Sequence, residues 1–248
     1  LYWMQASQRV ESNPALEFAI RKANEEGIPL LTYFGITDDF PEANLRHYAF
    51  MIEGLEEVNE KLDQRGIKFL VRQTNPPDGA IDLAREASLV VVDRGYLKIQ
   101  RRWRNKVAAK IDVPLYQIEG DVVVPVEVAS DKEEYAARTI RPKITKKIEK
   151  FAGPTETVAL DNPSKKLDLA GEELDDILES LEVDRSVKPS PVFSGGASEA
   201  KKLLEEFVEN KLDDYDEFSS NPSKDYLSHM SPYLHFGQIS PVYILNRV

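Results

Sequence analysis

The first half of the chain alternates short apolar runs with longer amphipathic segments. An apolar run of about four to eight residues is typical of a buried strand, and apolar residues three and four positions apart are typical of a helix. This pattern predicts strands at residues 1–4, 29–36, 68–72, 89–93 and 115–118. It predicts helices at residues 14–26, 45–65, 78–87 and 99–111.

Residues at the ends of the first two helices support these bounds. Pro14 occupies a first-turn position, and Gly27 and Gly66 follow the last apolar residues of the two helices. The alternation of strands and helices predicts an α/β fold: a doubly wound, parallel, five-stranded, Rossmann-like sheet with right-handed crossovers. Ligands of such sheets bind beyond the carboxyl ends of the strands, so candidate binding residues are expected at that edge.

The pattern changes after Pro125. Residues 126–162 contain no clean strand and include a basic run, which predicts a linker to another domain. Apolar spacing predicts helices at residues 164–181, 197–212 and 241–248. The expected domains are an α/β domain at 1–125, a linker at 126–162 and the beginning of a helical domain at 163–248.

Neither end of the sequence has the features of a terminus. The first residues lie inside a predicted strand, and Val248 lies inside a predicted helix with neither a cap nor a polar tail. We therefore expect the sequence to be part of a longer protein.

Composition narrows the range of chemistry. The chain has no cysteine, which excludes disulfides and thiolate metal sites. Its three histidines have no metal-ligand spacing to a carboxylate cluster, so we expect no metal. No apolar run approaches the length of a membrane span. The composition is that of a globular protein, and the lack of cysteine is compatible with a reducing cytoplasm. We expect a cytoplasmic monomer without membrane contact.

The net charge of −11 argues against a general nucleic-acid binder, which usually carries a basic surface. The charge is uneven, however. Residues 98–110 and 138–150 are basic, whereas residues 161–184 and 199–217 are acidic. Binding to DNA through a local patch therefore remains open.

Residues 221–231 form a polar turn region before a predicted helix. Ser228 and Ser231 supply hydroxyls, and Pro232 favours a helix start. A helix N-terminus with free amides and nearby hydroxyls can bind phosphate. From the spacing alone, a serine-capped helix without a ligand is the more common structure.

Residues 226–241, with the run 231–241 at their centre, resemble the flavin-phosphate segment of the photolyase and cryptochrome family. Residues 128–144, and residues 2–4 followed by 8–16, resemble class II cyclobutane pyrimidine dimer photolyases. Residues 47–55 and 193–197 also match, so the resemblance covers nearly the whole chain in the right order.

This resemblance implies an antenna-pigment domain, a linker and an all-helical domain that binds FAD. It implies light-driven repair of cyclobutane pyrimidine dimers in UV-damaged DNA by electron transfer from reduced FAD. A cryptochrome-like flavin photoreceptor without repair activity is the alternative. A nucleotide-binding module similar to electron-transfer flavoproteins is a third interpretation, supported by the α/β half alone.

The resemblance also assigns candidate binding residues. The expected flavin contacts are Tyr215, Leu227, Ser228, His229, Met230 and Ser231. Arg9, after the first strand, is expected to face a deazaflavin-type antenna pigment, and a surface arginine is the alternative interpretation. No catalytic residue is expected within this chain, because the family's electron-relay tryptophans and dimer-contacting carboxylate would follow Val248.

The sequence departs from the family at two places and leaves other residues with two interpretations. Residues 216–221 lack the arginine that many relatives use to touch DNA, and His229 stands where many carry arginine or asparagine. Asp93 either caps the next helix or meets a ligand. The basic residues of the predicted helix 99–111 either bind phosphate or form a solvated face. In the linker, Arg138, Arg141 and Lys143 are expected to pair between domains.

Overall fold

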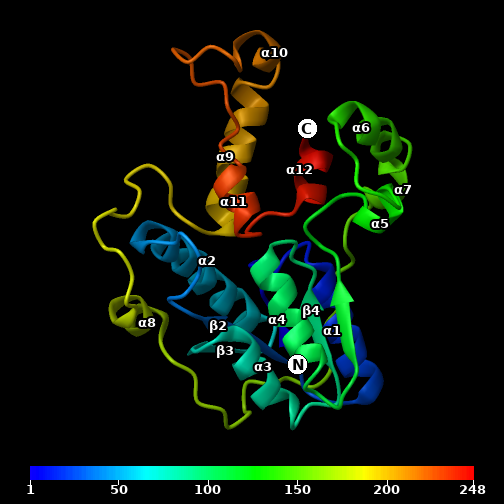
Figure 1. Ribbon diagram of the computed structural model, residues 1–248, viewed down its shortest axis with the longest axis vertical. Coiled ribbons are helices and arrows are strands. Elements are labelled where there is room, and N and C mark those ends of the chain that lie inside the picture. Colours follow the sequence, from blue (N-terminus) through cyan, green and yellow to red (C-terminus); the bar gives the residue numbers. More distant parts are fainter.

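The computed structural model describes residues 1–248. Its centre is a parallel sheet (Figure 1). The strand order is β3-β2-β1-β4-β5. The strands are β1 (Tyr2–Trp3), β2 (Leu31–Ile36), β3 (Lys68–Gln73), β4 (Val90–Asp93) and β5 (Leu115–Ile118). All four pairings are parallel, which confirms the predicted doubly wound α/β fold.

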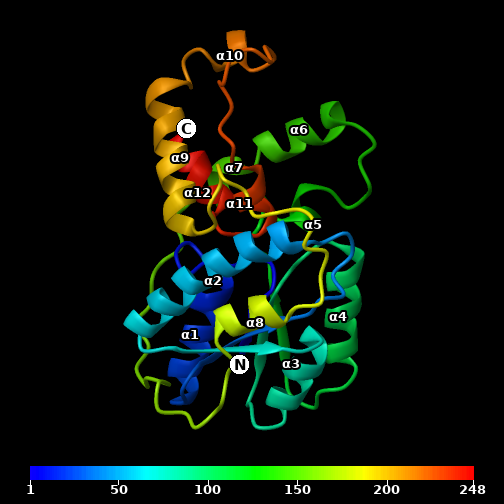
Figure 2. The same ribbon diagram turned by 90° about the vertical axis from the view of Figure 1, so that its left-hand side faces the viewer.

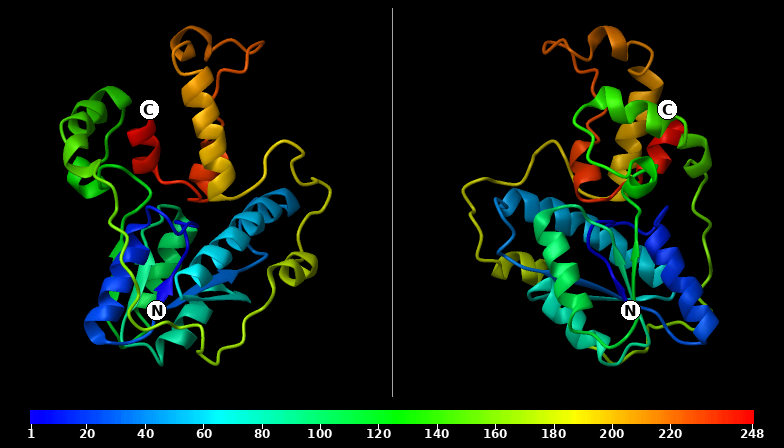
Figure 3. Two further views of the ribbon diagram at one scale, coloured as in Figure 1. Left: turned by 180° about the vertical axis from the view of Figure 1, so that it is seen from behind. Right: turned by 45° about the vertical axis from the view of Figure 1, so that its right-hand side comes forward.

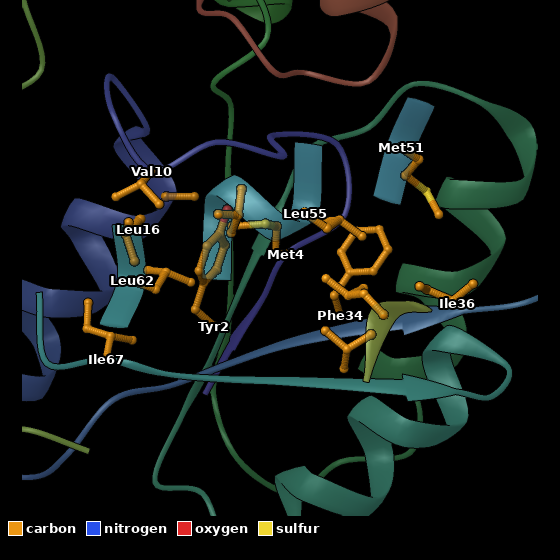
Figure 4. Close-up of a cluster of buried hydrophobic side chains, with 14 of the residues drawn as sticks. Tyr2, Met4, Val10, Leu16, Phe34, Ile36, Met51, Leu55, Leu62 and Ile67 are labelled. Atoms are coloured by element: carbon orange, nitrogen blue, oxygen red, sulfur yellow. The ribbon is translucent and has the colours of Figure 1, made fainter. Parts of the chain in front are cut away.

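Four helices cover the two faces of the sheet. They are α1 (Pro14–Glu26), α2 (Leu45–Gln64), α3 (Pro76–Ala84) and α4 (Lys98–Ala108). Side chains of α1 and α2 share one core cluster with one face of the sheet, and side chains of α3 and α4 share a second cluster with the other face. Figure 4 shows side chains from β1, β2, α1 and α2 converging in the first cluster.

Burial on both faces explains why the strands are apolar throughout. Val90, Val91 and Val92 are all fully buried. Val91 packs in the cluster of α1 and α2, whereas Val90 and Val92 pack in the cluster of α3 and α4. Successive side chains of a strand point to opposite faces, so an unbroken apolar run is what a covered parallel sheet requires.

The predicted linker contains three short helices, α5 (Val126–Ala129), α6 (Ala137–Thr145) and α7 (Ile148–Phe151). Figures 1 and 3 show this segment beside α12 (Pro241–Arg247), and the Asn246 side chain donates to the Ala152 carbonyl at 2.9 Å. The expected inter-domain pairing of Lys143 is wrong. Its ammonium lies 2.5 Å from Glu134 of the same segment. Arg138 lies over the Tyr135 ring, and no ion pair involves Arg141.

The predicted helix at 164–181 is wrong over its first ten residues, and only α8 (Leu174–Ser180) is helical. The Ser164 hydroxyl accepts from the Lys68 amide at 2.7 Å, and the Glu172 amide donates to the Val71 carbonyl at 3.0 Å. Lys68 and Val71 belong to β3, an edge strand of the sheet. The segment therefore pairs with free backbone groups of this edge strand instead of forming a helix. Helix α8 packs beside α2 (Figure 2), with Leu174 and Ile177 in its core cluster.

The remaining helices are α9 (Ala197–Asn210), α10 (Tyr215–Phe218), α11 (Ser231–His235) and α12. A third core cluster joins this part to α2, because Phe50 of α2 packs with Leu204, Phe207 and Tyr233. Figure 2 shows α10 at one end of α9 and α11 at the other, next to the α/β body. None of the helices is both long and apolar enough to cross a lipid bilayer.

Charged side chains also join α9 to the α/β body. Lys61 of α2 lies 2.7 Å from both Glu11 and Glu57, and Lys201 of α9 pairs with Glu11. Partial burial raises the pKa of both carboxyls. Glu11 accepts hydrogen bonds from Lys201 and Lys61, and Glu57 accepts them from Lys61 and Ser198. These hydrogen bonds outweigh the effect of burial, so the pKa of each carboxyl lies below its ordinary value. The two carboxylates therefore stabilise the fold above about pH 4.5, and this contribution is lost as the pH falls through their folded pKa values.

Replacing Lys201 by methionine should lower the free energy of unfolding by about 1 kcal/mol at neutral pH and low salt. The loss should shrink in 1 M salt, and again as Glu11 is protonated in acid. The matched control is Lys202→Met, because Lys202 is exposed and lies 3.6 Å from a partly exposed Glu199. Urea unfolding of both variants measures the difference, and equal losses would show that the network does not stabilise the docking of α9.

Candidate cofactor sites

A cavity of about 570 Å³ lies beyond the carboxyl ends of β1, β2 and β4. Its floor is the loop that follows β1, and its walls come from the end of β2 and from α2 and α4. Leu234, His235 and Phe236, at the end of α11, also line it. Aromatic rings dominate the lining; they belong to Trp3, Phe34, Phe40, Tyr48, Tyr96, Trp103 and Phe236. This is the edge at which doubly wound sheets bind ligands.

Several buried polar atoms of the lining residues have no hydrogen-bond partner. They are Nε1 of Trp3, both polar atoms of the Gln5 carboxamide and Oε1 of Gln8. Gln5 is 7% exposed and Gln8 is 5% exposed. Leaving a buried polar group unpaired costs about 1–3 kcal/mol, so such groups in a native cavity call for a partner.

Asp93, at the end of β4, fixes the loop that carries these residues. Its Oδ2 accepts from the backbone amides of Gln5, Ala6 and Ser7 at 2.8, 3.0 and 3.1 Å, and its Oδ1 accepts from the Tyr2 hydroxyl at 2.8 Å. Burial raises the pKa of Asp93 and the neighbouring Asp121 raises it further, while these hydrogen bonds act in the opposite direction.

The predicted capping role of Asp93 is wrong, because its two carboxylate oxygens accept from the Tyr2 hydroxyl and from the amides of the loop after β1. Helix α4 begins after Leu97 instead, and the Gln100 side chain accepts from the Leu97 amide at 3.2 Å. The short connection between β4 and α4 still lies at the cavity, where Gly95 and Tyr96 line it.

Arg9 does not occupy the ligand-facing position that the sequence interpretation requires. It is 1% exposed and is not among the cavity residues. Its guanidinium donates to the carbonyls of Gly120 and Gly237, both at 2.8 Å, and pairs with Asp121 at 3.1 Å. These groups leave little of the guanidinium for a pigment, so the structure gives Arg9 a role in packing.

The second candidate site is the run before and at the start of α11. Ser231 is the first residue of the helix and is exposed. The hydroxyls of Ser228 and Ser231 make no hydrogen bond within the chain, and no side chain caps the helix. The serine-capped helix is therefore not the structure that forms. Both hydroxyls are free to donate to an anion.

The other residues of the predicted flavin set have different surroundings. His229 has a positive φ of 55°, and its Nε2 lies 2.6 Å from Asp225. Met230 is 4% exposed and packs in the third core cluster, so only its backbone can meet a ligand. Leu227 is 45% exposed.

Tyr215 is not brought together with this run. It lies in α10, with its ring edge against Phe207 at 5.6 Å. Figures 1 and 2 show α10 and α11 at opposite ends of α9. A helix of 14 residues is about 21 Å long. A single ligand would have to span this length to contact both Tyr215 and Ser231.

A family model described as DNA photolyase matches residues 1–163. The chain belongs to the DNA photolyase family. The matched residues include the whole sheet and the loop below the cavity.

Curated relatives extend the photolyase match over the full chain. A deoxyribodipyrimidine photo-lyase of Methanothermobacter thermautotrophicus is 46% identical over 247 residues, which are 100% of this chain and 55% of the relative. One from Potorous tridactylus is 34% identical and covers 97% of this chain and 46% of the relative. Cryptochrome-2 of Arabidopsis thaliana is 50% identical over only 48 residues. The chain spans about half the length of the photo-lyases that it matches.

Solved structures share the photolyase fold at lower identity. A bacterial class III photolyase from Agrobacterium tumefaciens has a TM-score of 0.77 at 19% identity and covers 99% of this chain and 52% of its own. An archaeal photolyase from Sulfolobus tokodaii, solved with two FAD molecules, has a TM-score of 0.73 at 16% identity and covers 99% of this chain and 53% of its own.

Sequence reasoning missed the residues that fix α11 on the photolyase α/β body. The Gln238 carboxamide is buried, accepts from the Gly196 amide at 2.8 Å and donates to the Phe50 carbonyl at 3.2 Å. Gly237, with a φ of 66°, lies against the Ala6 carbonyl. Gln238 and Gly237 belong to the motif at 226–241, but the serines of that motif suggested phosphate binding and not the docking of α11.

The basic residues of α4 have separate roles. Arg101 and Arg102 are exposed, as a solvated helix face predicts. Arg104 is 8% exposed, and its Nε donates to the Gln117 side chain at 2.7 Å. Lys106 pairs with Asp78 at 2.5 Å. Because α4 divides its charges between solvent and local partners, it offers no concentrated phosphate site.

Proposed function

We propose that the chain is part of a class II cyclobutane pyrimidine dimer photolyase. One observation carries the repair function: in sequence, photo-lyases match this chain from end to end, whereas the cryptochromes match only 48 residues. Residues 128–144 and 8–16 support class II, because they resemble that class. The substrate is UV-damaged DNA, and the protein acts as a monomer in the cytoplasm.

In this proposal residues 1–125 form the antenna domain, 126–162 the linker and 163–248 the beginning of a helical FAD-binding domain. Reduced FAD, when bound, supplies the electron that splits the dimer after light absorption. Ser228 and Ser231 bind its pyrophosphate through their free hydroxyls, and the first turn of α11 adds backbone donors. Leu227, His229 and Met230 shape the same turn. That Tyr215 contacts FAD is a prediction from the resemblance.

The cavity at the carboxyl edge is the proposed site of the antenna pigment, a deazaflavin-type ring. Its size falls within the range of about 300–1,000 Å³ that small-molecule sites occupy, and its lining is mainly apolar and aromatic. Asp93 holds the loop below the ring, and the end of α11 forms part of the cavity wall.

The test is light-dependent repair by the full-length gene product. A thymine-dimer oligonucleotide should be repaired under blue light and not in the dark, and the purified protein should show a flavin absorption spectrum. Flavin binding without repair would favour the cryptochrome alternative, and absence of flavin would favour a nucleotide-binding module. The 248-residue chain alone should not repair dimers.

Replacing Ser231 by alanine should weaken FAD binding about tenfold, because one hydrogen bond to a charged phosphate is lost. The control is Ser88→Ala, an exposed serine before β4 at the opposite edge of the sheet. Flavin released during equilibrium dialysis gives the two dissociation constants. Equal constants for the two variants would remove Ser231 from the phosphate site.

A further inference from the structure

Residues 138–150 of the linker are basic in an otherwise acidic chain. They hold six lysine or arginine residues and one carboxylate, Glu149, which gives the segment a net charge of +5, whereas the whole chain carries −11. Duplex DNA carries one negative charge for about every 1.7 Å of its length. A protein with this net charge therefore approaches DNA favourably only through a local basic surface.

The six cations of the segment fall into two sets. Two have partners inside the linker: Lys143 pairs with Glu134 at 2.5 Å, and the Lys147 ammonium donates to the Val128 carbonyl. The other four are exposed and make no ion pair, and we call them the linker cations; they are Arg138, Arg141, Lys146 and Lys150. Because the fold uses none of their charges, they are free to meet an anionic partner.

The arrangement of the linker cations suits phosphate groups. Arg138 and Arg141 are three positions apart in α6, so they share one face of the helix. The Arg138 guanidinium lies 6.0 Å from the ring centroid of Tyr135, which is 79% exposed and presents its hydroxyl to solvent. Arginine, lysine and tyrosine side chains all donate to the phosphate oxygens of DNA.

The position of α6 favours DNA over the other half of the same side. Figure 1 and the left view of Figure 3 show α6 and α10 on opposite sides of α12. The start of α10 and the residues before it carry four exposed carboxylates: Asp213, Asp214, Asp216 and Glu217. DNA that reaches the proposed flavin site is therefore repelled on the side of α10 and attracted on the side of α6.

We propose that the linker cations bind the phosphate backbone of duplex DNA whether or not the DNA is damaged. This inference rests on the proposed function, since it names the surface that holds DNA while the flavin acts on a dimer. Phosphate contacts carry no information about sequence or damage, so this surface lets the protein search undamaged DNA. Each contact releases a condensed counterion, and the resulting signature is a steep fall of affinity with salt.

The test is binding of an undamaged duplex by the FAD-loaded, full-length protein, followed by fluorescence anisotropy between about 0.05 and 0.2 M salt. The variant Arg138→Gln/Arg141→Gln should reduce the slope of log affinity against log salt by about two, because each phosphate contact contributes about 0.9. Its affinity at about 0.1 M salt should fall about tenfold or more.

The matched control is Arg101→Gln/Arg102→Gln, which removes the same charge from two exposed arginines of α4. This control should keep the slope and change the affinity by less than about twofold. Equal losses in the two variants would overturn the proposal, because the effect would then belong to the net charge and not to α6.

Pairing of α6 with another part of the full-length protein is the competing explanation. It predicts a lower melting temperature for Arg138→Gln/Arg141→Gln with an unchanged salt slope, and that result would overturn the proposal. Binding of phosphate predicts an unchanged melting temperature. It also predicts that Arg138→Lys/Arg141→Lys, which keeps both charges, restores the slope.

A duplex that contains a thymine dimer separates this surface from the dimer site. The glutamine variant should bind it more weakly by the same factor, which leaves the preference for damaged DNA unchanged. A loss confined to the damaged duplex would overturn the damage-independent role.

Blue-light repair by the unsubstituted protein tests the proposed function separately. Repair together with an unchanged slope in the variant would reject this inference alone. A reduced slope in the variant, without repair by the unsubstituted protein, would reject the proposed function and keep the DNA surface.

Discussion

Replacing Gly237 by alanine is expected to lower the free energy of unfolding by about 3 kcal/mol. Gly237 has a φ of 66°, a conformation that costs a residue with a Cβ about 1–2 kcal/mol. A Cβ there would also overlap the carbonyl oxygen of Ala6, which belongs to the backbone and cannot rotate away. Relief of such an overlap costs about 1–3 kcal/mol more.

Gly27→Ala is the matched control for this variant. Gly27 has nearly the same φ, 65°, but nothing lies within 4 Å of a Cβ built on it. It should therefore lose only the backbone cost of about 1 kcal/mol. Urea unfolding of both proteins isolates the overlap as the difference between them. If the two losses are equal, α11 does not dock closely on the loop after β1.

Replacing Arg9 by methionine is expected to lower the free energy of unfolding by about 4 kcal/mol. The methionine fills part of the space but donates no hydrogen bond. It leaves the carbonyls of Gly120 and Gly237 without a donor, and it leaves Asp121 with the Ser7 hydroxyl but without a cation. Removal of one member of a buried charged pair is costly because the remaining groups stay buried and unpaired.

Arg102→Met provides the comparison, because Arg102 is exposed on α4 and makes no ion pair. It should change the stability by less than about 0.5 kcal/mol. The same unfolding measurement distinguishes the two roles proposed for Arg9. A loss in Arg9→Met as small as that in Arg102→Met, with weaker pigment binding, would restore the antenna role that the sequence suggested.

The sequence predicted the sheet well because its signals are local. Helix α1 has the predicted bounds, since Asn13 caps its start, Pro14 occupies its first turn and Gly27 ends it with a positive φ. The apolar run that ends at Asp93 could only be a strand covered on both faces.

The predicted helix at 164–181 failed for the opposite reason. Leu167 and Leu174 have helical spacing, but Ser164 and Glu172 hydrogen-bond to the edge strand β3. That edge is about one hundred residues earlier in the chain, and its unpaired groups cannot be read from local spacing.

The candidate sites were predicted in part. The motif located the run around Ser231, and the fold located the carboxyl edge, but neither showed which atoms are free. Arg9 donates to the carbonyl of Gly237, which is 228 positions later in the chain, and local sequence cannot predict such a contact. The position of Gln5 and Gln8 directly after a buried strand could have marked them as candidate binding residues. Their unpaired atoms could not be predicted, because they depend on the loop geometry that Asp93 imposes.

The docking of α11 has a consequence for the order of folding. Arg9 meets Gly237, and the Gln8 amide donates to the Phe236 carbonyl at 3.4 Å, so these contacts close a loop of nearly the whole chain. Contacts this distant in sequence are slow to form, because the intervening chain must first lose much of its freedom. The surface that receives α11 exists only after Asp93 has ordered the loop after β1. We therefore expect the backbone amides of the sheet to gain hydrogen-exchange protection during refolding before those of α11 do.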